Sequence, residues 1–125
     1  MPTTTLTAVS LAARAEEVLG MARKAERGRS ASTIQGGRGH LLRQTLLALV
    51  ADRSLGEHET HGEASLQVII GSVVLTSGEL VIEARAGDLI SVPAARHVLS
   101  ARTDAVVLLT IATPHDQPPS DTSPR

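Results

Sequence analysis

The sequence predicts a mainly β protein in which antiparallel strands form a sandwich or barrel, preceded by one α-helix. From residue 31 onward, short segments rich in Val, Ile and Leu follow one another and are separated by Gly, Pro, Ser and Asp. Apolar residues recur at helical spacing only before residue 30. Because no helical segment interrupts the strands, a parallel βαβ sheet is not expected.

The composition is that of a single domain with an aliphatic core. A chain of 125 residues buries about two thirds of its unfolded surface on folding. Phe, Tyr and Trp are absent, so no side chain offers a stacking surface for bases or sugar rings. With 12 basic and 13 acidic residues the net charge is −1, which excludes long-range attraction to nucleic acid or an anionic membrane. The absence of cysteine, of a signal peptide and of a spanning apolar run predicts a soluble, cytoplasmic protein.

The first expected element is a helix from Ser10 to about Arg27, within an N-terminal segment of residues 1–30. Ser10 is the expected N-cap and Gly28 the expected stop. The apolar stripe is mostly alanine, so the helix is expected to lean on a larger surface. Its members are Leu11, Ala15, Val18, Leu19, Ala22 and Ala25.

Residues 31–112 are expected to form the β domain, and residues 113–125 a disordered tail. Turn residues such as Gly36, Gly37, Gly71, Gly78 and Pro93 bound the segments. The tail is rich in Pro, Ser, Thr and Asp and buries too little apolar surface to order itself. The expected strands are SASTIQ, HLLRQTLLALVA, SLQVII, SVVLTS, ELVIEA, DLISVP, HVLSA and AVVLLTIA.

One short stretch, LGEHETHGEASLQVIIG from Leu55 to Gly71, concentrates histidines and carboxylates before an apolar run. In that run Leu66, Val68 and Ile70 alternate with polar residues, so even positions are expected to face inward. The same parity includes Ala64 and His58. The stretch is not a zincin motif, because the second histidine of HETH comes one residue too early and the segment lies between strands.

This stretch and the later GDLISVP segment resemble the two motifs of small single-domain cupins, G(X)5HXH(X)3-4E(X)6G and G(X)5PXG(X)2H(X)3N. Gly71 matches the last glycine of the first motif, and Gly87 and Pro93 match the start of the second. The resemblance covers roughly residues 41–112 and implies a jelly-roll β-barrel with a divalent metal in its mouth.

The metal ligands of the resemblance are only partly present. His58 takes the place of the first metal histidine, but Thr60 and Ala64 take those of the second histidine and the glutamate. In the second motif His97 comes one residue early. Since Gly62 allows a turn or bulge, a cluster of His58, His61, His97 and Glu63 would offer donors for iron, zinc, manganese or nickel. A metal-free pocket with solvated His61 and Glu63 is the alternative.

Arginines occur in two short segments near the start of the predicted β domain. The glycine-rich QGGRGH is expected to be a hairpin turn with a solvated Arg38, because it lacks the following Lys-Ser/Thr of a phosphate loop. Arg43 and Gln44 interrupt an apolar run. They are expected either to face water or to reach into the barrel mouth.

The predicted function is that of a small-molecule-binding or sensory cupin module, with or without a metal. The missing metal ligands favour this hypothesis. The alternative is a metal-dependent enzyme of the dioxygenase, isomerase or lyase type, since fold resemblance alone does not choose a reaction. A homodimer is the expected assembly, because a long apolar strand is hazardous as a bare sheet edge.

Overall fold

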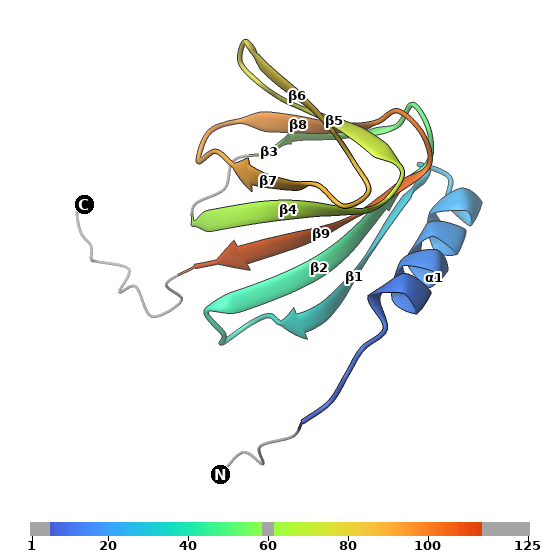
Figure 1. Cartoon of the computed structure of the whole chain (residues 1–125), viewed down its shortest axis with the longest axis vertical. Helices are drawn as coiled ribbons and strands as arrows, with labels where there is room; N and C mark the ends of the chain where they lie inside the picture. Colours follow the sequence, from blue (N-terminus) through green and yellow to red (C-terminus); the bar gives the residue numbers. More distant parts are fainter. Residues whose placement is uncertain (1–5, 59–61, 114–125) are drawn as a thin grey trace, which may run out of the picture.

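The computed structural model describes residues 6–58 and 62–113, which form one α-helix and nine β-strands (Figure 1). In chain order these are α1 (Leu11–Lys24), β1 (Arg29–Gly36), β2 (Leu42–Leu49), β3 (Ser54–His58), β4 (Glu63–Ile70), β5 (Ser72–Ser77), β6 (Leu80–Arg85), β7 (Leu89–Val92), β8 (His97–Ala101) and β9 (Ala105–Ala112). The prediction of a mainly antiparallel β fold with an N-terminal helix is confirmed. Of the predicted tail of residues 113–125, the structure describes only Thr113, whose N–H donates to the Leu41 carbonyl at 2.9 Å; the rest lies outside the described residues.

The strands form two sheets of the jelly-roll type. One sheet has the order β1-β2-β9-β4-β7 and the other the order β3-β8-β5-β6. Every strand pair is antiparallel. Among the described residues the two sheets are not hydrogen-bonded into a closed barrel. The protein is therefore a sandwich with strand ends and turns at each of its two ends.

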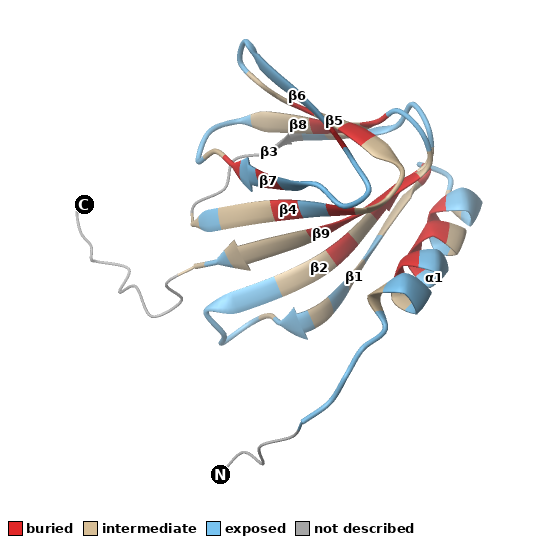
Figure 2. Cartoon of the chain, in the orientation of Figure 1, coloured by how far each residue is buried: buried red, intermediate tan, exposed pale blue. Residues whose placement is uncertain are grey.

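Two apolar cores stabilise this arrangement (Figure 2). The first lies between the sheets and is built from aliphatic side chains of both, including Leu49, Val73 and Val107. The second lies between α1 and the outer face of the five-stranded sheet, where Val18 and Leu19 pack against Leu46, Val106 and their neighbours. The shallow alanine stripe of the helix thus rests on a larger apolar surface, as the sequence predicts.

The N-terminus of α1 matches the prediction and its C-terminus does not. The Ser10 hydroxyl accepts a hydrogen bond from the Ala13 N–H at 3.1 Å, as an N-cap does. The helix ends at Lys24 rather than near Arg27, because Ala25 is already extended and the Gly28 N–H bonds back to its carbonyl. Gly28, with φ 70°, then turns the chain into β1. No helix in the described part of the chain is long and apolar enough to cross a membrane.

The strand predictions need three corrections. β3 was expected as part of a connecting stretch, because its SLGEH sequence carries a single large apolar residue. The inward parity of β4 holds for Leu66 and Val68, but a bulge shifts the register before Ile70, which packs toward the helix core. β2 is not an edge strand, since β1 and β9 pair with its two sides.

Candidate functional site

The candidate site lies at one end of the sandwich, called the mouth below, where β2, β4 and β8 begin and β7 and β9 end. The strand register aligns Arg43, Ile111, Ala64 and Val92 in one row across the five-stranded sheet. Val92 is buried and Ala64 packs against the core between the sheets. Residues directly opposite each other share a face, so Arg43 and Ile111 also belong to the inner face.

The sequence left two alternatives for Arg43 and Gln44, facing water or reaching into the barrel mouth. In the structure Arg43 lies on the inner side of the mouth and remains exposed there. Gln44 lies on the opposite face of β2, where its side-chain amide donates to the Thr110 hydroxyl at 3.1 Å. The informative signal was parity, because Arg43 shares its spacing with Leu47 and Leu49, which contact the core between the sheets.

The two histidines of the motif resemblance lie opposite each other in the other sheet. The backbone of His58, at the end of β3, pairs with that of His97, at the start of β8. His97 shares the parity of Leu99 and Ala101, both buried between the sheets, and is itself half-buried. Its Nδ1 lies 2.9 Å from the Ala95 carbonyl oxygen. A carbonyl only accepts, so Nδ1 carries a proton and donates this hydrogen bond.

Of the two remaining predicted ligands the structure describes only Glu63, which does not lie in the inner row. Glu63 is exposed and pairs with Ala112, one position outward from the Ala64 and Ile111 row, so regular alternation places it on the outer face. His61 lies outside the described residues. Among the described residues, no three His, Cys, Asp or Glu side chains come close enough together to hold a metal ion. The predicted site of His58, His61, His97 and Glu63 therefore stays a prediction, because His61 is not among the residues searched.

Gly62 has a structural role that differs from the bulge considered in the sequence. A Cβ atom at this position would lie 2.3 Å from the Ala112 carbonyl oxygen and 2.9 Å from the Thr113 methyl carbon. The absence of a side chain thus lets the chain entering β4 approach the end of β9. This close approach brings the start of β4 and the end of β9 together at the mouth.

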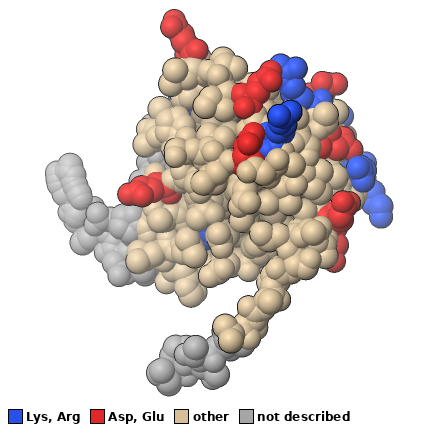
Figure 3. All heavy atoms as spheres, viewed as in Figure 1, with Lys and Arg blue, Asp and Glu red and all other residues tan. Residues whose placement is uncertain are grey.

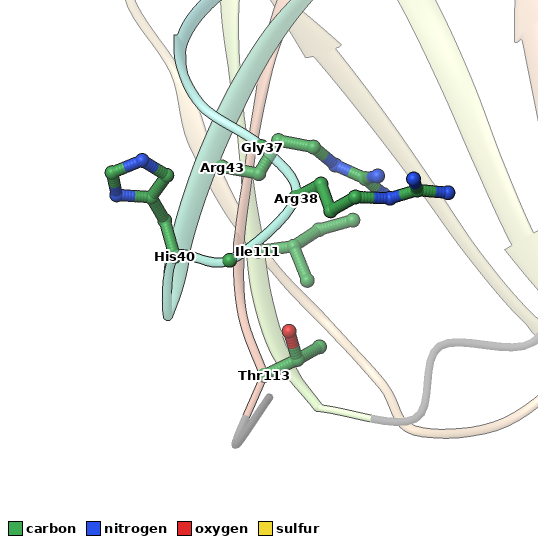
Figure 4. Close-up of a pocket in the computed structure, with 7 residues that line it drawn as sticks. Gly37, Arg38, His40, Arg43, Ile111 and Thr113 are labelled. Atoms are coloured by element: carbon green, nitrogen blue, oxygen red, sulfur yellow. The ribbon is translucent and has the colours of Figure 1, made fainter. Parts of the chain in front are cut away.

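A cavity of about 460 Å³ opens at the edge of the mouth, between the β1–β2 hairpin and the end of β9. Figure 4 shows the Arg38 and Arg43 side chains extending in the same direction, with Ile111 and Thr113 nearby and His40 turned to the other side. The QGGRGH segment ends β1 and forms the hairpin loop to β2, as predicted. Its Arg38 is exposed, as expected, and also lines this cavity. The lining residues are Gly37, Arg38, Gly39, His40, Arg43, Ile111 and Thr113.

The charge distribution elsewhere is balanced by local pairs. Figure 3 shows acidic and basic side chains intermixed on the visible face, without a broad patch of one sign. At the end of the sandwich away from the mouth, Asp104 accepts hydrogen bonds from the Ala51 N–H at 2.9 Å and from Arg23 at 3.0 Å. The Ala51 hydrogen bond, followed by that of Arg23, lowers the pKa of Asp104 below its usual value. This carboxylate ties α1 to two loops and is not part of the mouth.

Comparison with solved structures identifies the fold. A cupin superfamily protein from Desulfitobacterium hafniense superposes with a TM-score of 0.62 at 18% identity, covering 67% of this chain and 76% of that chain. An RmlC-like cupin protein from Desulfovibrio desulfuricans gives 0.60 at 25% identity, with coverages of 67% and 81%. The chain has a cupin-type fold. The resemblance inferred from the Gly71 and GDLISVP positions is confirmed at this level.

A larger enzyme shares the same fold over part of its length. The salicylate 1,2-dioxygenase of Pseudoaminobacter salicylatoxidans superposes with a TM-score of 0.70 at 16% identity, covering 80% of this cupin-type chain and 32% of the enzyme. This likeness concerns the fold alone. No protein-family model matches the sequence, and no curated protein matches it.

Proposed function

We propose that this cupin-type domain is a binding module that holds a small molecule at the mouth. The observation that carries the proposal is the cavity of about 460 Å³ at the mouth. Its volume falls in the range of small-molecule sites, about 300–1,000 Å³. It combines an aliphatic wall from Ile111 with the polar side chains of Arg38, Arg43 and Thr113. Few polar groups placed around an apolar wall are typical of ligand pockets.

The packing between the two sheets supports a ligand site at the mouth. The side chains between the sheets are buried aliphatic groups such as Leu66, Val68 and Leu99. Close-packed cores leave few voids large enough for a ligand. A ligand would therefore sit at the mouth rather than deep between the sheets.

The proposal is tested by titrating the ¹⁵N-labelled full chain with a set of small neutral and charged compounds and mapping amide shifts by nuclear magnetic resonance. Shifts are expected at the mouth ends of β2, β4 and β9. Ala64→Leu extends a side chain into the inner row and should weaken binding, whereas Ala112→Leu, one row outward and exposed, should not. Shifts confined to the opposite end of the sandwich would refute the proposal.

A second candidate is a metal-dependent enzyme of the dioxygenase, isomerase or lyase type. The observation that favours it is the backbone pairing of His58 with His97 at the mouth. Histidine imidazoles supply nitrogen ligands that suit iron, zinc, manganese and nickel. His61 and Glu63 would have to complete the ligand set, and Ala64 occupies the inner position where the cupin motif has a glutamate. Elemental analysis of untagged protein distinguishes this candidate from the binding module.

We further propose a homodimer formed through β6, in place of the β2 edge considered in the sequence. β6 is an edge strand, and its consecutive residues Leu80, Val81 and Ile82 are 71%, 62% and 50% exposed. An exposed apolar edge strand offers unpaired backbone groups to a second strand. Two identical edges can pair antiparallel about a two-fold axis, so a second copy of this chain is the partner that fits.

A further inference from the structure

We infer that the mouth cavity binds a small organic anion, whose carboxylate or phosphate group is held by Arg38 and Arg43. The inference rests on the proposed binding function and specifies the class of ligand. The two arginines line one cavity, although one comes from the β1–β2 hairpin and the other from β2 itself. A guanidinium group presents paired N–H donors that match the oxygens of carboxylates and phosphates.

The charge balance of the cavity favours an anion. In the part of the chain that the structure describes, neither Arg38 nor Arg43 forms an ion pair, and no Asp or Glu lines the cavity. By contrast, Arg23 is paired with Asp104 and Arg102 with Glu83. Two positive groups lining one cavity repel each other. An anion bound between them removes that repulsion and accepts charge-assisted hydrogen bonds.

The hairpin that carries Arg38 is held in place by its backbone. Gly37 and Gly39 have φ values of 120° and 84°, which residues other than glycine rarely adopt. The His40 N–H donates to the Gly37 carbonyl at 3.0 Å, and the Thr113 N–H donates to the Leu41 carbonyl at 2.9 Å. The first bond closes the turn and the second ties the loop to the end of β9, so Arg38 is presented to the cavity by an anchored turn.

The other lining groups indicate an organic anion. A cavity of about 460 Å³ is larger than a lone inorganic anion fills. Ile111 supplies an apolar wall that a short hydrocarbon portion would contact. The chain contains no Phe, Tyr or Trp, so the cavity offers no large aromatic ring on which a nucleobase would stack. The ligand class that fits best is a compact carboxylate or phosphate ester with an aliphatic part.

The test is a nuclear magnetic resonance titration of the ¹⁵N-labelled full chain with hexanoate, hexanamide and inorganic phosphate. Hexanoate should shift the Gly37 and Gly39 amide signals saturably, with a dissociation constant on the order of 1 mM. Arg38→Gln and Arg43→Gln should each weaken binding by at least about tenfold, since each removes charged hydrogen bonds. Arg85→Gln, an exposed arginine at the other end of the sandwich, should leave it unchanged.

The three probes separate the outcomes. Preference for hexanoate supports the inference with a carboxylate as the bound group, and saturable phosphate binding lost in both variants supports it with a phosphate. Hexanamide binding as tightly as hexanoate, or no saturable shift with either anion, overturns it. If hexanamide shifts mouth residues such as Ala64 and is insensitive to both arginine variants, the anion inference fails while the proposed binding function stands.

Discussion

Replacing Gly71 with alanine tests why the first motif of the cupin resemblance ends in a glycine. Gly71 forms the β4–β5 turn with φ 82°, and an added Cβ would lie 2.1 Å from the Asp104 carbonyl oxygen and 2.7 Å from the Thr103 hydroxyl. Gly78, in the β5–β6 turn, is a matched control. Its φ is 62°, but an added Cβ would meet no atom within 4 Å.

The expected losses follow from these two geometries. Alanine in the left-handed region costs about 1–2 kcal/mol, and this cost applies to both variants. At Gly71 the contact with a backbone oxygen forces the chain to move, which adds about 1–3 kcal/mol. With about 4 °C of melting temperature per kcal/mol, Gly78→Ala should lower Tm by roughly 4–8 °C and Gly71→Ala by roughly 8–20 °C.

Thermal unfolding followed by far-ultraviolet circular dichroism measures both variants against the unmodified chain. The difference between the two Tm losses isolates the cost of the close approach, because the conformational cost is common to both. Equal losses would mean that the loop carrying Asp104 moves aside freely. In that case the steric explanation of the Gly71 position would be wrong.

Three further predictions concern charge, metal and assembly. Asp104→Asn should lower the free energy of unfolding at neutral pH by at most about 1 kcal/mol, since the pair with Arg23 is exposed and screened. Because the pKa of Asp104 is lowered in the folded state, this contribution exists above pH about 4 and disappears as the pH falls further. Chemical denaturation at several pH values should therefore show the unfolding free energies of the variant and the parent converging in acid. A difference in unfolding free energy that stays constant with pH would contradict the assignment. Untagged protein dialysed against a weak chelator should hold no stoichiometric metal by elemental analysis, because Ala64 stands where the cupin motif has a carboxylate. Retained metal that disappears in the His58→Ala, His97→Ala double variant would instead establish the metal centre. Val81→Lys should convert a dimer into a monomer in light scattering without loss of folded signal, and a dimer that persists would place the interface elsewhere.

Much of the fold was readable from local patterns. The strand segments were predictable because β-branched and leucine-rich runs end at glycines and prolines, and the N-cap because Ser10 precedes a helical stripe. The resemblance to cupins depended on spacings around Gly71 and Pro93. In the structure Gly71 has a left-handed backbone that alanine tolerates poorly.

The predictions that were wrong concern features of the fold that depend on long-range contacts. The helix ends at Lys24 because the chain must turn back to begin β1. Arg23 and Lys24 in its last turn fit a helix end, but Arg27 follows them, so the basic residues alone do not locate it. β3 has too few apolar residues to be predicted from its sequence, and it forms because it pairs with the edge of β8. The bulge before Ile70 arises from pairing with β9 and redirects that side chain to the helix core.

The sequence by itself determined the fold class, the strand positions and the aliphatic nature of the core, because periodicity and turn residues act over a few positions. Only the tertiary structure decided which polar residues meet. Arg38 and Arg43 line one cavity because the β1–β2 hairpin folds beside the end of β9, some 70 residues later in the chain. Glu63 lies one row outward from Ala64 and on the outer face of the sheet, because its backbone pairs with Ala112. Register, which depends on partners distant in sequence, therefore decided the composition of the candidate site.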